Sequence, residues 1–101
     1  MRRIINGKMY NTESALKVAS FFEGDSVSDL EHFGGELYRK KTGEWFLYIY
    51  GGPMSRYVEP YSSEINGISK IIPYTEKEAK KWLEANDFVD EYIKYFGEPE
   101  E

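Results

Sequence analysis

One stretch of the sequence, Trp45-Phe46-Leu47-Tyr48-Ile49-Tyr50, constrains the fold more than any other. All six residues are aromatic or branched aliphatic, the types that are enriched in or well suited to strands. Because side chains alternate across a strand, Trp45, Leu47 and Ile49 share one face and the other three residues share the opposite face. A strand that is apolar on both faces needs a cover on each side. The sequence therefore predicts a central strand here.

Turn signals on either side of this strand predict its partners. Residues 36–41 read as a strand, and Thr42-Gly43 joins it to the central strand, with Gly43 in the left-handed turn position. At the N-terminus, Asn6-Gly7 separates two short β-favouring runs, which is the strongest short-range signal for a hairpin. Gly51-Gly52-Pro53 ends the central strand.

Two further strands are expected after that break, at residues 55–61 and 68–72, separated by a turn at Asn66-Gly67. Pro60 and Pro73 place both strands at sheet edges, because proline cannot donate to a ladder.

Helical periodicity appears at both ends of the chain. Asn11 or Thr12 is expected to cap a first helix, whose apolar positions recur at i, i+3, i+4 and i+7 and are Ala15, Val18, Ala19 and Phe22. The residues that follow, 23–35, read as a loop anchored by Val27, Leu30 and Phe33.

Near the C-terminus, Thr75-Glu76-Lys77-Glu78 forms a capping box ahead of an apolar stripe of Ala79, Trp82 and Leu83. Asp87 is expected to cap a last helix that Gly97 ends.

The predicted fold class is α+β, in a single domain spanning residues 1–101 with a frayed tail at 98–101. A small antiparallel sheet, built from the N-terminal hairpin, central strands within residues 36–50 and the following edge strands, packs against an N-terminal helix and two C-terminal helices. A chain of 101 residues has room for one such core.

Composition narrows the class of protein. The chain has no cysteine, so it has neither a disulfide framework nor a thiolate metal site, and it lacks a signal-peptide h-region and any long apolar run. We therefore expect a cytoplasmic protein outside the membrane. The charge is uneven: residues 1–57 carry 8 basic and 7 acidic side chains, and residues 58–101 carry 5 and 11. This acidic C-terminal part is typical of solvated helix faces and is also compatible with docking on a basic protein groove.

Groups that would carry catalysis are sparse. The one histidine, His32, lies among Asp25, Asp29 and Glu31, but these residues lack a recognisable metal-ligand spacing. The glycines at 51 and 52 are not followed by the Lys and helix of a phosphate-binding Walker loop. We predict no catalytic residues, no metal, no cofactor and no small-molecule substrate.

The predicted binding surface is the hairpin and the glycine turn after it. Basic and aromatic side chains of the types enriched at binding hot spots gather there. They are Arg39, Lys40, Lys41, Tyr48, Tyr50, Arg56 and Tyr57. Basic groups interleaved with aromatics also stack bases and pair phosphates, so contact with RNA stays open, as does a solvated hairpin tip over a core of rings. The acidic helices are the other candidate interface.

Four blocks of the sequence together carry a resemblance. They are IINGKMYNTE at residues 4–13, LYRKKTGEWFL at 37–47, GGPMSRY at 51–57 and IPYTEKEA at 72–79. This set resembles small proteins of phages and conjugative elements of Gram-positive bacteria. Some of these are similar to anti-CRISPR proteins, which inhibit the RNA-guided nuclease of type II systems. No contact residue of such an inhibitor maps onto this sequence.

The resemblance implies an accessory protein that inhibits a type II CRISPR effector nuclease, by stoichiometric binding or by interference with its guide RNA. Its acidic C-terminal part suits the basic channel in which such nucleases hold guide and target. Two alternatives remain: a small RNA-binding or RNA-cleaving protein, and a structural or regulatory protein of a mobile element with a different protein partner.

Overall fold

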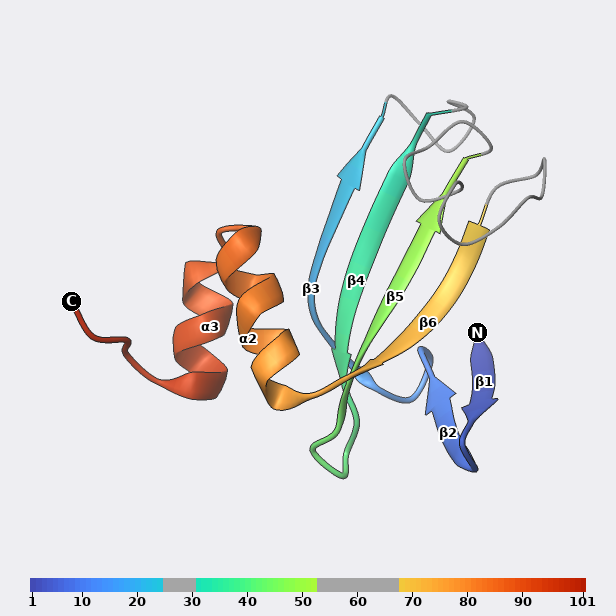
Figure 1. Cartoon of the computed structure of the whole chain (residues 1–101), viewed down its shortest axis with the longest axis horizontal. Coiled ribbons are helices and arrows are strands. Elements are labelled where there is room, and N and C mark those ends of the chain that lie inside the picture. The colour runs from blue at the N-terminus through green and yellow to red at the C-terminus, as the bar shows by residue number, and fades with distance from the viewer. Residues whose placement is uncertain (25–30, 53–67) are drawn as a thin grey trace.

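The computed structural model describes residues 1–24, 31–52 and 68–101. In chain order the described elements are β1 (Arg2–Ile5), β2 (Lys8–Asn11), β3 (Leu16–Glu23), β4 (Phe33–Arg39), β5 (Trp45–Gly51), β6 (Ile68–Tyr74), α2 (Glu76–Ala85) and α3 (Val89–Phe96). The fold class is α+β, as predicted (Figure 1).

Four strands form the main sheet in the order β3-β4-β5-β6, with every neighbouring pair antiparallel. The strand at 45–50 is flanked on both sides, which confirms its predicted central place. Among the described strands β6 lies at an edge of the sheet, as predicted, and Pro73 lies opposite Phe46 in its register. At such an edge the missing N–H of proline costs no ladder bond.

β1 and β2 form the predicted N-terminal hairpin, but as a two-stranded sheet of its own. Asn6 and Gly7 have φ values of 51° and 78°, the two positive angles of a type I′ turn. Because β1 and β2 pair only with each other among the described strands, the prediction that this hairpin belongs to the main sheet is wrong.

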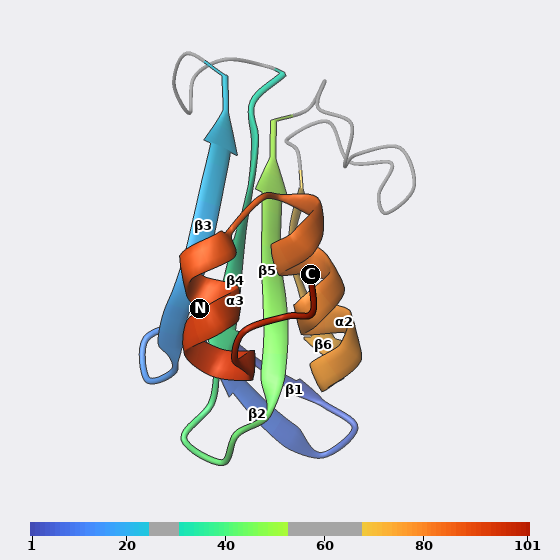
Figure 2. The same cartoon turned by 90° about the vertical axis from the view of Figure 1, so that its left-hand side faces the viewer.

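The sheet is covered differently on its two faces. α2 and α3 pack against one face, and the β1–β2 hairpin lies across the other face at the end near the β4–β5 turn (Figures 1 and 2). Both covers were required by the alternating apolar side chains of β5.

The helix-side core contains Ala19, Leu37, Trp45, Leu47, Ile49, Ala79 and Leu83. The hairpin-side core contains Tyr10, Tyr38, Phe46 and Ile71. Trp45, Leu47 and Ile49 thus share one face, and Phe46 and Tyr48 share the other, as the alternation predicts.

The predicted helix over Ala15 to Phe22 is wrong, because Leu16 to Phe22 lie in β3 and Ala15 directly precedes this strand. Four apolar positions fit a helix period, yet Val18, Phe21 and Phe22 also suit a strand, and short apolar runs leave the two periods ambiguous. The pairing register with β4 shifts between Lys17 and Ala19, so the neighbouring residues Val18 and Ala19 both contact the helix-side core. Two adjacent apolar residues on one face are typical of a helix, and this is why the sequence pattern was misleading.

The prediction that residues 23–35 form a loop is wrong at both ends, because β3 includes Glu23 and β4 begins at Phe33. Its Gly34-Gly35 pair has low strand propensity, but the missing Cβ atoms make room for rings on both faces of the sheet. Three further predictions fall outside the described residues. They are the loop anchors Val27 and Leu30, the strand at 55–61 and the turn at Asn66-Gly67.

At the C-terminus the capping box is confirmed. The Glu78 backbone N–H donates to Thr75 Oγ1 at 3.1 Å, and the Thr75 N–H donates to Glu78 Oε1 at 2.8 Å. Ala79 and Leu83 are buried, and Trp82 is half-buried against the same core. Gly97, with φ of 85°, ends α3 as predicted.

Asp87 does not cap α3. Phe88 occupies the N-cap position without a side-chain hydrogen bond, and Asp87 has φ of 60° in the tight link between the helices. Aspartate tolerates this left-handed conformation better than most residues, so its local role is the turn.

Candidate functional site

The predicted binding residues lie at two separate places. Arg39 ends β4, Lys40 and Lys41 lie in the β4–β5 turn, and Tyr48 and Tyr50 lie on β5. Arg56 and Tyr57 lie outside the described residues.

Backbone hydrogen bonds fix the turn that carries the cations. The Lys40 N–H donates to the Glu44 carbonyl at 2.8 Å, and the Gly43 N–H donates to the Lys40 carbonyl at 2.9 Å. Gly43 has φ of 93°, which confirms its predicted left-handed position. The turn therefore presents its basic side chains from a defined backbone.

Arg39 is held by aromatic rings. Its guanidinium carbon lies 5.3 Å from the centroid of the Trp45 ring and 5.7 Å from that of Tyr95, so β4, β5 and α3 together orient it. The side chain stays exposed. Such cation–π contacts are worth ~0.5–1 kcal/mol at exposed sites, and they restrict the guanidinium without removing it from water.

The Lys40 side chain is held by contacts within the protein. Its Nζ lies 3.6 Å from the centroid of the Tyr10 ring and 3.4 Å from Glu44 Oε1, and its side chain is only 14% exposed. Glu44 also accepts a hydrogen bond from Lys8 at 2.7 Å, which is the main reason that the pKa of Glu44 lies below its ordinary value. Lys40 thus joins the turn to the N-terminal hairpin and is a poor candidate for contact with a partner.

Lys41 is exposed and makes no ion pair within the described part of the chain. Two shallow hollows meet beside it. One, of about 440 Å³, extends past Ala15 and Leu16 to Tyr95, and the other, of about 280 Å³, extends to Met9. Leu16 is 56% exposed and Met9 49% exposed. We call Arg39, Lys41, Ala15 and Leu16 the basic turn surface.

Tyr48 and Tyr50 do not belong to this surface. They lie on the face of the sheet opposite Arg39 and farther along β5 from the turn. The Tyr48 hydroxyl lies 3.1 Å from Ser69 Oγ. The Tyr50 ring stacks with Phe22 at 6.4 Å and lies 6.3 Å from the His32 ring. These tyrosines form a second aromatic group.

Gly34 sets the position of Tyr50 and was missed in the sequence. A Cβ at Gly34 would lie 2.4 Å from Cζ of Tyr50, so only glycine lets this ring lie flat over β4. The signal was available, since glycine inside a strand often marks a close approach of another group. The Gly34-Gly35 pair was read instead as part of a loop.

Tyr38 and Glu36 form a polar pair on β4, where Glu36 lies opposite Tyr48 in the strand register. The Tyr38 hydroxyl donates to Glu36 Oε1 at 2.7 Å, and Lys17 Nζ lies 3.5 Å from Glu36 Oε2. Burial, and then this hydrogen bond, raise the pKa of Tyr38 far above its ordinary value. The phenol is therefore held protonated and does not act as a base near neutral pH.

Within residues 1–24, 31–52 and 68–101, no three His, Cys, Asp or Glu side chains come together in a way that could hold a metal ion. The acidic residues Asp25 and Asp29 lie outside these ranges. Neither α2 nor α3 is long and apolar enough to cross a membrane.

Comparison with known proteins adds no relative. No protein-family model, curated protein or solved structure matches this chain.

Proposed function

We propose that this chain acts by stoichiometric binding to a protein, and that the partner is the effector nuclease of a type II CRISPR system, alone or with its guide RNA. The identity of the partner rests on the sequence resemblance. The observation that supports binding is the basic turn surface, where an oriented arginine and an exposed lysine flank apolar hollows. Such a partner would place the protein in the cytoplasm of a bacterial host.

Arg39 is the expected anchor of this contact. Arginine is enriched at binding hot spots, and its planar head makes several hydrogen bonds at once. Because Trp45 and Tyr95 already hold the guanidinium, less side-chain freedom is lost on association. Leu16 supplies exposed apolar area next to it.

Ring contacts near the cations favour a protein partner over RNA. Binding of single-stranded RNA combines phosphate contacts with bases stacked on open aromatic faces. Arg39 lies over Trp45 and Tyr95, and Lys40 lies over Tyr10, so these rings are already engaged. Tyr48 and Tyr50 lie on the other face of the sheet.

A cleavage assay with purified type II nuclease tests the proposal. The protein is added in increasing amounts before guide loading, or before target addition, and cut DNA is measured. A binder should reach full inhibition near one molecule per nuclease. Inhibition by far fewer molecules, or shortened guide RNA on a gel, would indicate an enzyme instead.

The double variant Arg39→Glu/Lys41→Glu assigns the surface and leaves Lys40 in place. We expect loss of inhibition, with a fall in melting temperature below about 8 °C because the lost cation–π contacts are weak. Lys77→Glu/Lys81→Glu on α2 is the matched control, since both lysines are exposed and the charge change is the same. Equal loss in both variants would reject the assigned surface. Failure to inhibit any type II nuclease tested would reject the partner.

A further inference from the structure

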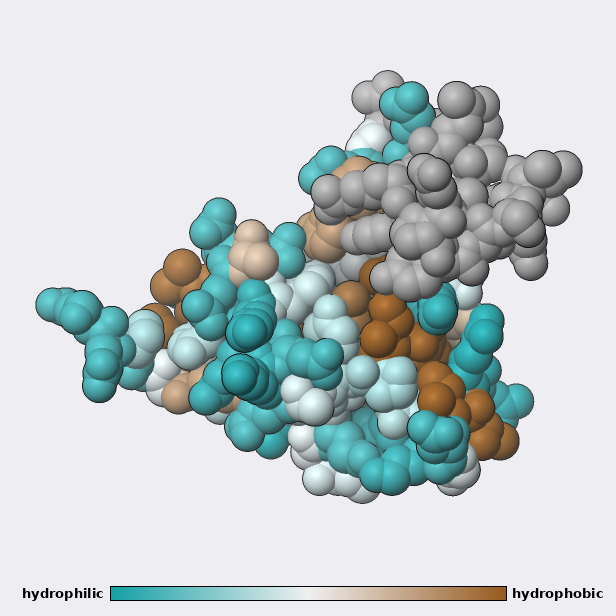
Figure 3. All heavy atoms as spheres, viewed as in Figure 1, coloured by the Kyte–Doolittle hydropathy of each residue, from teal (hydrophilic) through white to brown (hydrophobic). Residues whose placement is uncertain are grey.

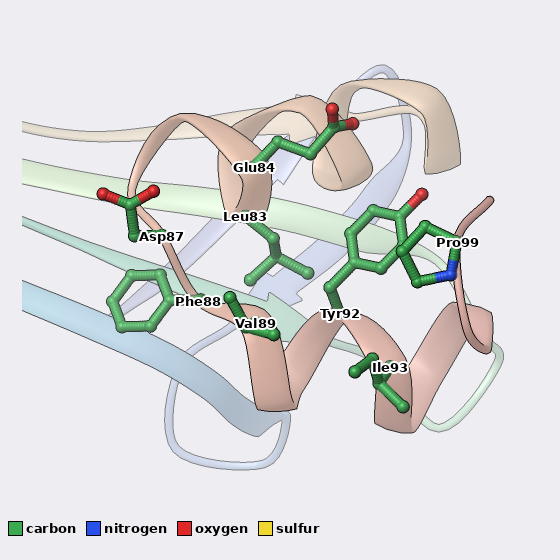
Figure 4. A pocket seen from close by; sticks show the side chains of 8 residues that line it. All are labelled: Leu83, Glu84, Asp87, Phe88, Val89, Tyr92, Ile93 and Pro99. Carbon is green, nitrogen blue, oxygen red and sulfur yellow. The ribbon is translucent and has the colours of Figure 1, made fainter. Parts of the chain in front are cut away.

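A groove on the outer side of the helix layer lies apart from the basic turn surface and shares no residue with it. It runs between α2 and α3 and holds about 270 Å³ (Figure 4). This volume is below the ~300 Å³ at which small-molecule sites begin, so the groove suits a few anchoring side chains of a macromolecule better than a whole small ligand.

The floor and walls of the groove are apolar. Leu83 of α2 is fully buried at its base, and Phe88, Tyr92 and Ile93 are half-buried around it. The Phe88 ring stacks on the Trp82 ring with centroids 5.5 Å apart, so this wall of the groove packs against α2. Val89 lies at the edge and is 62% exposed, the largest exposed fraction of any large hydrophobic residue on the helices described.

Carboxylates line the rim. Figure 4 shows Glu84 and Asp87 beside the groove, on the α2 side. Both are exposed, and within the described part of the chain neither has an ion-pair partner. An apolar groove with unpaired carboxylates at its edge is complementary to an apolar stripe flanked by cations.

The net charge of the C-terminal part of the chain has the same sign as the carboxylates at the rim. Residues 84–101 carry 7 acidic and 1 basic side chains, a net charge of −6, whereas residues 1–83 carry 11 acidic and 12 basic ones, a net charge of +1. A second copy of this chain would bring the same carboxylates face to face across a twofold axis, which is unfavourable. A cationic partner gains from the same charges.

We propose that this groove binds a short amphipathic helix with lysine or arginine at its flanks, presented by a protein partner. Helices of this kind dock into hydrophobic grooves through apolar residues at i, i+4 and i+7. Two of those residues would cover Leu83 and contact Val89 and Ile93, while the flanking cations would meet Glu84 and Asp87. This surface is independent of the nuclease inhibition proposed above.

The probe is a fluorescent helical peptide of about 14 residues with leucines at i, i+4 and i+7 and lysines at the flanks. Its binding to the full chain is followed by anisotropy at about 50 mM and 150 mM salt. A peptide with glutamates in place of the lysines is the charge control. We expect micromolar binding of the lysine peptide that weakens with salt, and at least about tenfold weaker binding of the glutamate peptide.

Matched variants distinguish binding in the groove from nonspecific electrostatic attraction of the peptide. Glu84→Gln/Asp87→Asn should weaken binding about fivefold or more, whereas Glu13→Gln/Glu23→Gln, which makes the same charge change at exposed sites of the sheet side, should change it less than about twofold. Val89→Ser should weaken binding about threefold through the apolar contact. Amide chemical shifts that move within residues 83–93 would locate the peptide there.

Several results would overturn the proposal. Equal weakening by the two charge-neutralising pairs would show nonspecific attraction, and shift changes confined to residues 39–41 would place the peptide elsewhere. Sedimentation that shows self-association abolished by Val89→Ser would make a second copy the occupant. Absence of peptide binding at millimolar concentration would remove the site, and none of these results depends on the nuclease assay.

Discussion

Single residues decide which rings lie over the main sheet. Gly34 admits Tyr50 on one face, and Gly35 admits Phe21 on the other, where an added Cβ would lie 2.8 Å from Cε1 of Phe21. We expect Gly34→Ala to displace the Tyr50 ring and to destabilise the fold by about 1–3 kcal/mol, the usual cost of overpacking. Chemical denaturation measures this loss. In the double variant Gly34→Ala/Tyr50→Ala the cost of the added methyl should largely vanish, and a cost that persists would point to backbone strain instead.

Tyr38 predicts a pH dependence at the same scale. Its pKa is raised in the folded protein, so the folded state holds the hydroxyl proton more tightly than the unfolded chain does. Its contribution to stability is therefore complete below the unfolded tyrosine pKa of about 10 and is lost as pH rises above that value. Denaturation midpoints measured from pH 8 to about 11 should fall less steeply in Tyr38→Phe. Identical slopes in the two proteins would contradict a raised pKa of Tyr38 in the folded state.

At the scale of elements, sequence patterns worked where one local cause dominates. The Asn6-Gly7 turn, the capping box at Thr75 and the strand at 45–50 were all predictable, because turn angles, a side-chain cap and strict alternation each fix a single conformation. β3 was not predictable from its own residues. Its hydrogen bonds go to β4, and its register shift at Lys17/Ala19 makes an edge strand look helical. Of the predicted binding residues, the structure brings Arg39, Lys40 and Lys41 together at the β4–β5 turn, whereas the alternation of β5 places Tyr48 and Tyr50 on the other face of the sheet.

Helix α2 depends on its cap. Removal of the hydroxyl in Thr75→Ala leaves the Glu78 N–H without its partner, and we expect a loss of about 1 kcal/mol in the free energy of unfolding. Thermal or urea unfolding measures it. Thr75→Ser retains the oxygen and should restore most of the stability, so equal losses in the two variants would show that the methyl group of threonine matters more than the cap.

Across the whole molecule, Trp82 joins the layers. Its ring lies 6.0 Å from Phe21 of β3 and 5.5 Å from Phe88 after α2, so it links the sheet edge to both helices. We expect Trp82→Ala to cost about 3 kcal/mol, the lower end for a large aromatic, because the side chain is half-buried. The adjacent exposed residue gives the control: Lys81→Ala should stay within about 0.5 kcal/mol. If Trp82→Ala left the free energy of unfolding unchanged, the Trp82 ring would not contribute to the core.

The strand order β3-β4-β5-β6 has a kinetic consequence, because each described strand of the main sheet pairs with the next described strand along the chain. Short loops close at low entropic cost, so the β4–β5 hairpin is the natural start of folding, and the strands on either side then add to it in turn. Because α2 and α3 follow the last strand in the chain, we expect them to dock on a sheet that has already formed. Mutations in the β4–β5 turn should therefore slow refolding, whereas mutations in α3 should mainly speed unfolding.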